Sequence, residues 1–151
     1  MGAPIITLWL SFDSAYVLAL CNIRGKGQDC VEMRAYDIDS GLNDPAFSVE
    51  YTGRYLKVLT IEQNKEGKLF ALPFNDHGKF FVSIVNSELG KQVKQLNVNA
   101  IMNIDENSIP IDGVKYPGIS CCFTSPNVIF VSLFHRFLQK QYSFFYNILN
   151  G

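Results

Sequence analysis

The chain has 151 residues, a formal net charge of −1 and a hydrophobic content of 48%. The length is that of one domain with a sizeable core, and the hydrophobic content excludes a chain that is disordered throughout. Positive charges are scattered without a basic patch, so nothing in the composition supports a nucleic-acid partner. The 12 Phe and 7 Tyr residues favour strands over helices.

The first third of the chain predicts three strands. Residues 5–11 are apolar and β-branched, and residues 16–23 form a continuous apolar run, as in a strand that is buried on both faces. Residues 31–38 alternate apolar and charged side chains, which indicates a half-exposed strand. A Gly-containing loop at residues 24–29 and a turn at residues 39–45 separate these elements.

The middle third predicts a hairpin between further strands. Residues 55–63 and 68–74 are apolar-rich and flank the turn at residues 64–67. Residues 47–51 form a short strand before this hairpin. Two more strands are expected after it, at residues 80–85 and 93–99.

The last third predicts the remaining strands. Residues 100–105 are expected to be a strand, and Asp112-Gly113 marks a type I′ hairpin. Three further strands are predicted at residues 119–123, 128–134 and 141–148. Because no stretch sustains helical spacing of apolar residues, the predicted fold is all-β, with about eleven or twelve short strands.

An internal repeat organises these strands. The segment Phe123–Phe134 aligns without gaps with Phe74–Val85, and also with the segment that begins at Phe12. The ends of the units agree as well: Tyr36–Gly41 parallels Tyr146–Gly151, with Leu96–Asn99 as a third version. The alignment predicts a single all-β domain with three repeats, at approximately residues 5–46, 47–99 and 100–151.

The repeated unit consists of a turn, a buried strand, a loop and a half-exposed strand that ends Tyr-Asp-Ile-Asp-Ser-Gly. This unit resembles a blade of a β-propeller, of the broad WD40, kelch and quinoprotein type. The resemblance implies antiparallel four-stranded blade-like sheets of a partial β-propeller. Trp9 is the sole Trp, and the Gly-His and Trp-Asp pairs of WD40 and the Gly-Gly doublet of kelch are absent. The alternative is a β-sandwich or barrel with a coincidental repeat.

The number of units raises the question of closure. A closed propeller has four to eight blades, whereas this chain has room for about three. We therefore expect either a piece of a longer propeller or a chain that completes its ring by association. Exposed apolar edges then need a protein partner, which is the remaining blades, another subunit or a second copy.

The loop Asp37–Asp44 is the candidate for calcium. It offers oxygen ligands at Asp37, Asp39, Asn43 and Asp44. The spacing is similar to that of a calcium loop, although Gly41 stands where a third carboxylate is expected and Leu42 where the glycine is expected. The competing interpretation is a strand-end turn in which Asp and Ser bond their own backbone. The segment with Asn103, Asp105 and Asn107 poses the same question more weakly.

The sequence contains no catalytic motif. His77 and His135 stand alone, without a cluster of possible metal ligands, and are interpreted as surface or loop residues. The Gly25-Lys26-Gly27 run is too short for a phosphate loop and no helix follows it. We therefore predict no catalytic, cofactor-binding or metal-binding residues and no cofactor.

The cysteines suggest a reducing environment. The spacing of Cys21, Cys30, Cys121 and Cys122 is not that of a zinc site. Cys21 and Cys122 lie in apolar runs and are expected in the core. Cys121 and Cys122 are adjacent, so they cannot both face the same side of a strand. The first ten residues make a poor signal peptide, and no apolar run approaches the ~18 residues of a membrane-spanning helix. A cytoplasmic or other intracellular location is expected.

Two function classes follow. The first is a non-enzymatic protein–protein interaction or scaffold module, a subunit of a larger assembly, as the blade-like repeat and the unpaired ends suggest. The second is a small-ligand or glycan-binding β-domain, with or without catalysis, which the many aromatic residues suggest. Most of these aromatic residues lie in strand runs and have the pattern of core residues, which favours the first class.

Overall fold

The computed structural model describes residues 5–11, 15–23, 29–41, 43–53, 56–58, 60–66, 68–76, 78–105, 118–135 and 139–150. Of residues 6, 7, 23, 29, 57 and 135 it describes the backbone alone. The Asp112-Gly113 hairpin, Gly25-Lys26-Gly27, His77, Asn107 and the His135 side chain lie outside the described part. The described residues form three antiparallel sheets, so the prediction of an all-β fold is confirmed.

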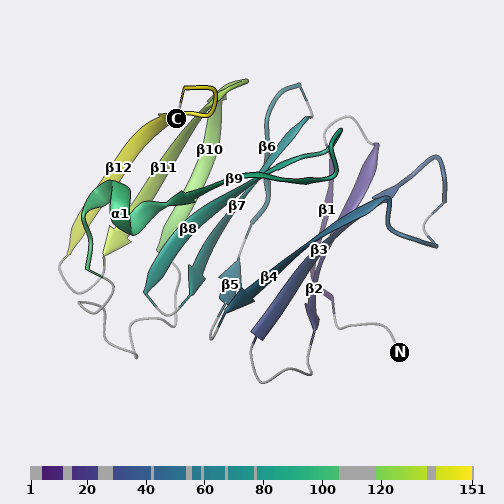
Figure 1. The fold of residues 1–151 in the computed structure, drawn as a ribbon, viewed down its shortest axis with the longest axis horizontal. Coiled ribbons are helices and arrows are strands. Elements are labelled where there is room, and N and C mark those ends of the chain that lie inside the picture. Colours follow the sequence, from purple (N-terminus) through teal and green to yellow (C-terminus); the bar gives the residue numbers. More distant parts are fainter. Residues whose placement is uncertain are drawn as a thin grey trace.

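Each sheet follows the order of the chain (Figure 1). The first sheet has the order β1-β2-β3-β4, with β1 (Ile5–Leu10), β2 (Tyr16–Ile23), β3 (Asp29–Asp37) and β4 (Phe47–Gly53). In the second sheet, β5 (Leu56–Val58) and β6 (Glu62–Gln63) both pair with β7 (Leu69–Asp76), followed by β8 (Lys79–Asn86) and β9 (Lys91–Asn97). The third sheet has the order β10-β11-β12, with β10 (Ile119–Ser125), β11 (Val128–His135) and β12 (Lys140–Asn147).

Two elements differ from the sequence-based expectation. Residues 55–63 were expected to form one strand, but β5 and β6 are separate short strands on the same neighbour, β7. Residues 100–105 were expected to be a strand, but the helix α1 (Val98–Met102) covers the start of this segment. Asn97 caps that helix by accepting a hydrogen bond from Ala100 N at 3.1 Å, and Asn103 ends it with φ at 54°.

The second sheet lies between the other two and is covered on both faces (Figure 1). One core cluster joins the first sheet to the second and contains the fully buried Leu20, Met33 and Phe74. The other cluster joins the second sheet to the third and contains the fully buried Ile84 and Ile129. Since each such side chain contributes about 1.5–3 kcal/mol on burial, these two clusters hold the sheets together.

The central hairpins of the three sheets share one hydrogen-bonding pattern. Strands β3, β8 and β12 end at Asp37, Asn86 and Asn147, and a side-chain oxygen of each accepts bonds from the backbone N–H groups two and three residues later. The residue after each donates its N–H to the carbonyl just before the hairpin: Ile38 to Ala15, Ser87 to Lys68, and Ile148 to Asn127, at 3.0, 2.8 and 2.8 Å. The hairpins β2–β3, β7–β8 and β11–β12 are therefore equivalent.

This equivalence corrects the repeat as aligned from the sequence. Aligning Phe74 with Phe123 makes β8 correspond to β11, whereas the hydrogen-bonding pattern makes β8 equivalent to the next strand, β12. The remaining copy of the turn is Asn86–Gly90 and not Leu96–Asn99, which spans the end of β9 and the start of α1. Strand β4 pairs with β3, so the first sheet extends to Gly53, beyond the expected boundary at residue 46. Apolar strands resemble one another at a period of two, so sequence similarity did not distinguish neighbouring strands.

Equivalent positions face the same way in all three sheets. We call the face that points toward the next sheet along the chain the forward face, and the opposite one the back face. On the forward face, Leu18 of the first sheet is equivalent to Ala71 of the second, and each lies in the cluster shared with the next sheet. On the back face, Leu72 is equivalent to Val131, and each lies in the cluster shared with the preceding sheet. The sheets thus stack forward face on back face, a head-to-tail relation.

Candidate interaction site

Two sheet faces have no neighbouring sheet among the described residues, namely the two ends of the stack. One is the forward face of the third sheet, which we call the C-terminal face, with Cys122, Phe130, Ser132, Phe134, Ser143 and Phe145. The other is the back face of the first sheet, which we call the N-terminal face, with Leu8, Leu10, Ala19, Cys21, Glu32 and Arg34. In the head-to-tail stack, the equivalents of both faces are covered by another sheet.

Phe145 is the clearest feature of the C-terminal face. Its equivalents in the first and second sheets are Ala35 and Ile84, and both are 0% exposed. Phe145 is 68% exposed, although it is the largest side chain of the three. A large apolar side chain gains free energy when it leaves water, so this position is suited to contact with another molecule.

Two other phenylalanines lie on the same face, and one of them contacts Phe145. The ring centroids of Phe130 and Phe145 are 5.0 Å apart, and Phe134 is 50% exposed. Polar groups lie between them, since Gln141 Nε2 donates a hydrogen bond to Ser132 Oγ at 3.1 Å. Aromatic side chains are enriched at the surfaces by which proteins bind one another, so the three phenylalanines are the part of this face that is suited to a contact.

The N-terminal face mixes apolar and charged groups. Leu8 and Leu10 are each more than half exposed, and they pair with Ala19 and Val17 of β2. Arg34 Nε lies 2.8 Å from Glu32 Oε1, and the hydrogen bond to Glu32 is the main cause that raises the pKa of Arg34. The equivalents of Arg34 are Ser83 and Phe144, which face a neighbouring sheet. The ion pair therefore distinguishes this face from the back faces inside the stack.

The exposure of the adjacent cysteines in β10 depends on the sheet face on which each side chain lies. The adjacent Cys121 and Cys122 lie on opposite faces, as expected, but it is Cys121 that is buried in the core, so the prediction that Cys122 is a core residue was wrong. Burial raises the pKa of Cys121 to about 12. Cys21 is buried as predicted, and burial raises the pKa of its thiol as well. No disulfide joins the four cysteines, all of which lie in the described residues.

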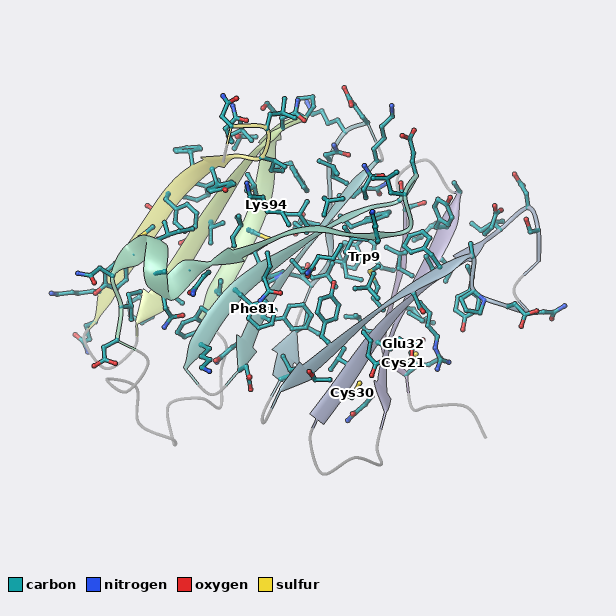
Figure 2. All side chains as sticks on the ribbon, in the orientation of Figure 1. Trp9, Cys21, Cys30, Glu32, Phe81 and Lys94 are labelled. Carbon is teal, nitrogen blue, oxygen red and sulfur yellow. The ribbon has the colours of Figure 1, made fainter. Side chains whose placement is uncertain are left out.

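A groove runs along the outer strands β4 and β9, where the first and second sheets meet. It is about 340 Å³ in volume. Two of its lining residues, Tyr51 and Gln92, are joined through the buried Ser83: Tyr51 Oη lies 2.7 Å from Ser83 Oγ, and Ser83 Oγ donates to Gln92 Oε1 at 2.6 Å. Phe81 lines the groove and stacks on the core residue Phe74 at 4.8 Å (Figure 2). These side chains join the two sheets to each other.

A second hollow of about 600 Å³ lies beside α1, and amide side chains contribute to its lining. Asn97 caps the helix. Asn99 accepts a hydrogen bond from Phe80 N at 2.6 Å and donates one to Gly78 O at 2.9 Å. These amides hold α1 against β8, whereas Gln95 and Lys79 give the hollow further polar groups.

Of the Asp37–Asp44 loop, residues 37–41 form a strand-end turn. Asp37 Oδ1 accepts hydrogen bonds from Asp39 N and Ser40 N at 2.9 and 3.3 Å, and Gly41 has φ at 92°, which favours glycine. The same turn is made by Asn86 and Asn147, which carry no charge, so the oxygen at this position serves the backbone. Across the part of the chain that is described, no three His, Cys, Asp or Glu residues are grouped so as to hold a metal ion.

Comparison with known proteins gives no match: none of the family models, the curated proteins or the solved structures is similar to this chain. No helix within the described segments is long and apolar enough to cross a membrane. The residues of the C-terminal face were missed at the sequence level. The alternation in β12 held a signal for them, because Ser143 and Phe145 face away from Tyr142, Phe144 and Tyr146.

Proposed function

We propose that this chain is a non-enzymatic protein–protein interaction module, built from blade-like sheets of a partial β-propeller within a larger assembly. The observation that carries the proposal is Phe145, which is 68% exposed at a position whose two equivalents are fully buried. The position that is covered in the first and second sheets is thus uncovered in the third, where it carries a larger apolar side chain. The C-terminal face is the surface that receives the partner.

The head-to-tail stacking supports the propeller part of the proposal. A relation in which each forward face packs on the next back face can continue until it closes into a ring. Propellers close with four to eight sheets, so the three sheets here account for part of such a ring. The thiols of the chain, which form no disulfide, support an intracellular and reducing location.

The test is a charge placed on the C-terminal face. Phe145→Glu introduces a carboxylate that a partner would have to desolvate, which costs several kcal/mol of binding. Leu89→Glu is the matched control, since Leu89 is 61% exposed in the turn between β8 and β9 and lies on neither terminal face. Tagged chains are expressed in the source cells, and captured proteins are quantified by mass spectrometry.

A protein that is captured by the native chain and by Leu89→Glu, but not by Phe145→Glu, is the expected result. If Phe145→Glu captures the same proteins in the same amounts, the C-terminal face is not the partner surface. A folded chain that stays monomeric by analytical ultracentrifugation and captures nothing would count against an interaction module altogether.

A second candidate function is the binding of a small polar ligand beside α1. The observation that favours it is the hollow of about 600 Å³, whose volume lies within the usual range of ligand pockets. Thermal-shift screening with saccharides and nucleosides tests it, with Gln95→Ala as the variant that removes one polar lining group. A hit whose shift is unchanged in Gln95→Ala would place the ligand elsewhere.

A further inference from the structure

We propose that the free edge of β12 binds an extended segment of another protein, which adds as the fourth, antiparallel strand of the third sheet. This inference rests on the proposed interaction function and names the form of the partner at the C-terminal end of the stack. The segment has about seven residues, the length of both β4 and β9.

The first argument is the position of β12 in the repeat. Strands β3, β8 and β12 end in the same turn and pair in the same register with the strand before them. Strand β3 is also paired with β4, and β8 is also paired with β9. Among the described strands, β12 is the last strand of its sheet. Its second edge therefore corresponds to the edge of β3 that pairs with β4 in the first sheet and to the edge of β8 that pairs with β9 in the second sheet.

The second argument is the direction of the backbone groups. Ile148 N donates a hydrogen bond to Asn127 O, the carbonyl just before β11. In an antiparallel pair, every second residue is hydrogen-bonded to the neighbouring strand, so the residues of β12 that are bonded to β11 are Tyr142, Phe144 and Tyr146. The N–H and C=O groups of Gln141, Ser143 and Phe145 therefore point away from β11, toward the free edge. In the first sheet, the carbonyl of Ala35, the equivalent of Phe145, accepts a hydrogen bond at 2.7 Å from the N–H of Ala46, the residue just before β4.

The chemistry of the segment follows from its two sides. Side chains on its forward side extend the apolar C-terminal face beside Phe145, and Val49 of β4 shows that apolar residues suit the forward side of a fourth strand. Side chains on its back side face β9, where Lys94 Nζ lies 4.9 Å from the centre of the Tyr146 ring (Figure 2 labels Lys94). The segment thus alternates apolar and polar residues and carries a carboxylate on the polar side.

The probe is a synthetic peptide with the sequence of residues 45–53, since this sequence forms β4 and meets these requirements with Val49 and Glu50. It is added to the full chain, and amide hydrogen exchange is followed residue by residue by NMR. Exchange is expected to slow at least about tenfold at Gln141, Ser143 and Phe145, whose N–H groups the peptide covers. A scrambled peptide of the same composition is the control. If it gives equal protection, or if the native sequence leaves these amides unprotected, the proposal is overturned.

Ser143→Pro removes one N–H group at the free edge without touching a bond to β11, and edge strands tolerate proline. Ser143→Ala keeps the N–H and is the matched control. Peptide affinity is expected to fall about tenfold in Ser143→Pro and to stay unchanged in Ser143→Ala. Equal affinity of both variants would overturn the proposal; if Ser143→Pro does not fold, the exchange experiment decides alone.

The partner assay separates this inference from the proposed function. A protein whose capture is lost in Phe145→Glu but kept in a folded Ser143→Pro leaves the interaction module standing and refutes strand addition. Loss in both variants supports strand addition.

Discussion

Strands β8 and β12 end in the same turn and carry the same pattern of backbone hydrogen bonds, but they lie in different surroundings. Strand β8 is paired on both edges and covered on both faces, with Val82, Ile84 and Val85 fully buried. Among the described strands, β12 pairs with β11 alone, and its residues alternate between partly buried and exposed. The difference shows that neighbouring sheets, rather than the hairpin itself, decide whether a position belongs to a core or to an exposed surface.

The largest expected effect contrasts two phenylalanines in these two sheets. Phe74→Ala empties a fully buried site against Tyr51 and Phe81, and it should cost about 3–5 kcal/mol in the free energy of unfolding. Phe145→Ala changes an exposed site and should cost less than about 0.5 kcal/mol in the isolated chain. Urea denaturation of both variants checks the contrast. Similar losses would mean that Phe145 contributes to the fold and not to a partner surface.

The next effect concerns pH and the junction between the first two sheets. Burial raises the pKa of Tyr51 to about 12, from about 10 in an unfolded chain. The unfolded state therefore loses this proton first, and the stabilisation is complete below about pH 10 and is lost as the pH rises toward 12. The free energy of unfolding should fall by about 2–3 kcal/mol more in the native chain than in Tyr51→Phe over this interval. Parallel pH profiles of the two proteins would contradict a buried, protonated Tyr51.

A smaller effect is expected at the repeated turn. Asn86→Ala removes two hydrogen bonds, to Glu88 N and Leu89 N, and should cost about 1–2 kcal/mol, because the turn connects two paired strands. Asn147→Ala removes the equivalent bonds at the free edge and should cost less, about 0.5–1 kcal/mol. Thermal unfolding followed by circular dichroism checks the order. The reverse order would show that the third turn is the more constrained one.

The smallest expected effect is on reactivity and leaves stability unchanged. At pH 8 a maleimide should modify Cys122 in the folded chain, because Cys122 is exposed on the C-terminal face. Cys121 should react after unfolding only, since burial holds its pKa near 12. The variant Cys122→Ser is the control and should remove the fast phase. Fast labelling of Cys121 instead would mean that the third sheet presents its other face.

The strand positions and the hairpin at residues 64–67 could be predicted well, whereas the alignment of equivalent strands was predicted poorly. The apolar runs and turn residues located β2, β7, β8, β11 and β12, because period-two patterning and breakers are local properties. The helix α1 was missed although its capping residues Asn97 and Asn103 stand in the sequence, since five residues are too few to show a helical period. The turn at Asn86 was not recognised as the third copy of the repeated turn, because the apolar similarity between Phe74 and Phe123 aligned β8 with β11 instead of β12.

The structure shows that Asp37 bonds its own backbone, which the sequence offered as one of two interpretations. The sequence by itself determined that this protein is all-β and that similar segments end the strands at Asp37 and Asn147. These properties depend on neighbouring residues and on side chains that bond their own backbone. The tertiary structure alone decided that Phe145 and Cys122 are exposed while Ile84 and Cys121 are buried. A strand pattern defines two faces, but which face is covered depends on the order in which whole sheets stack, and that order is a long-range property of the chain.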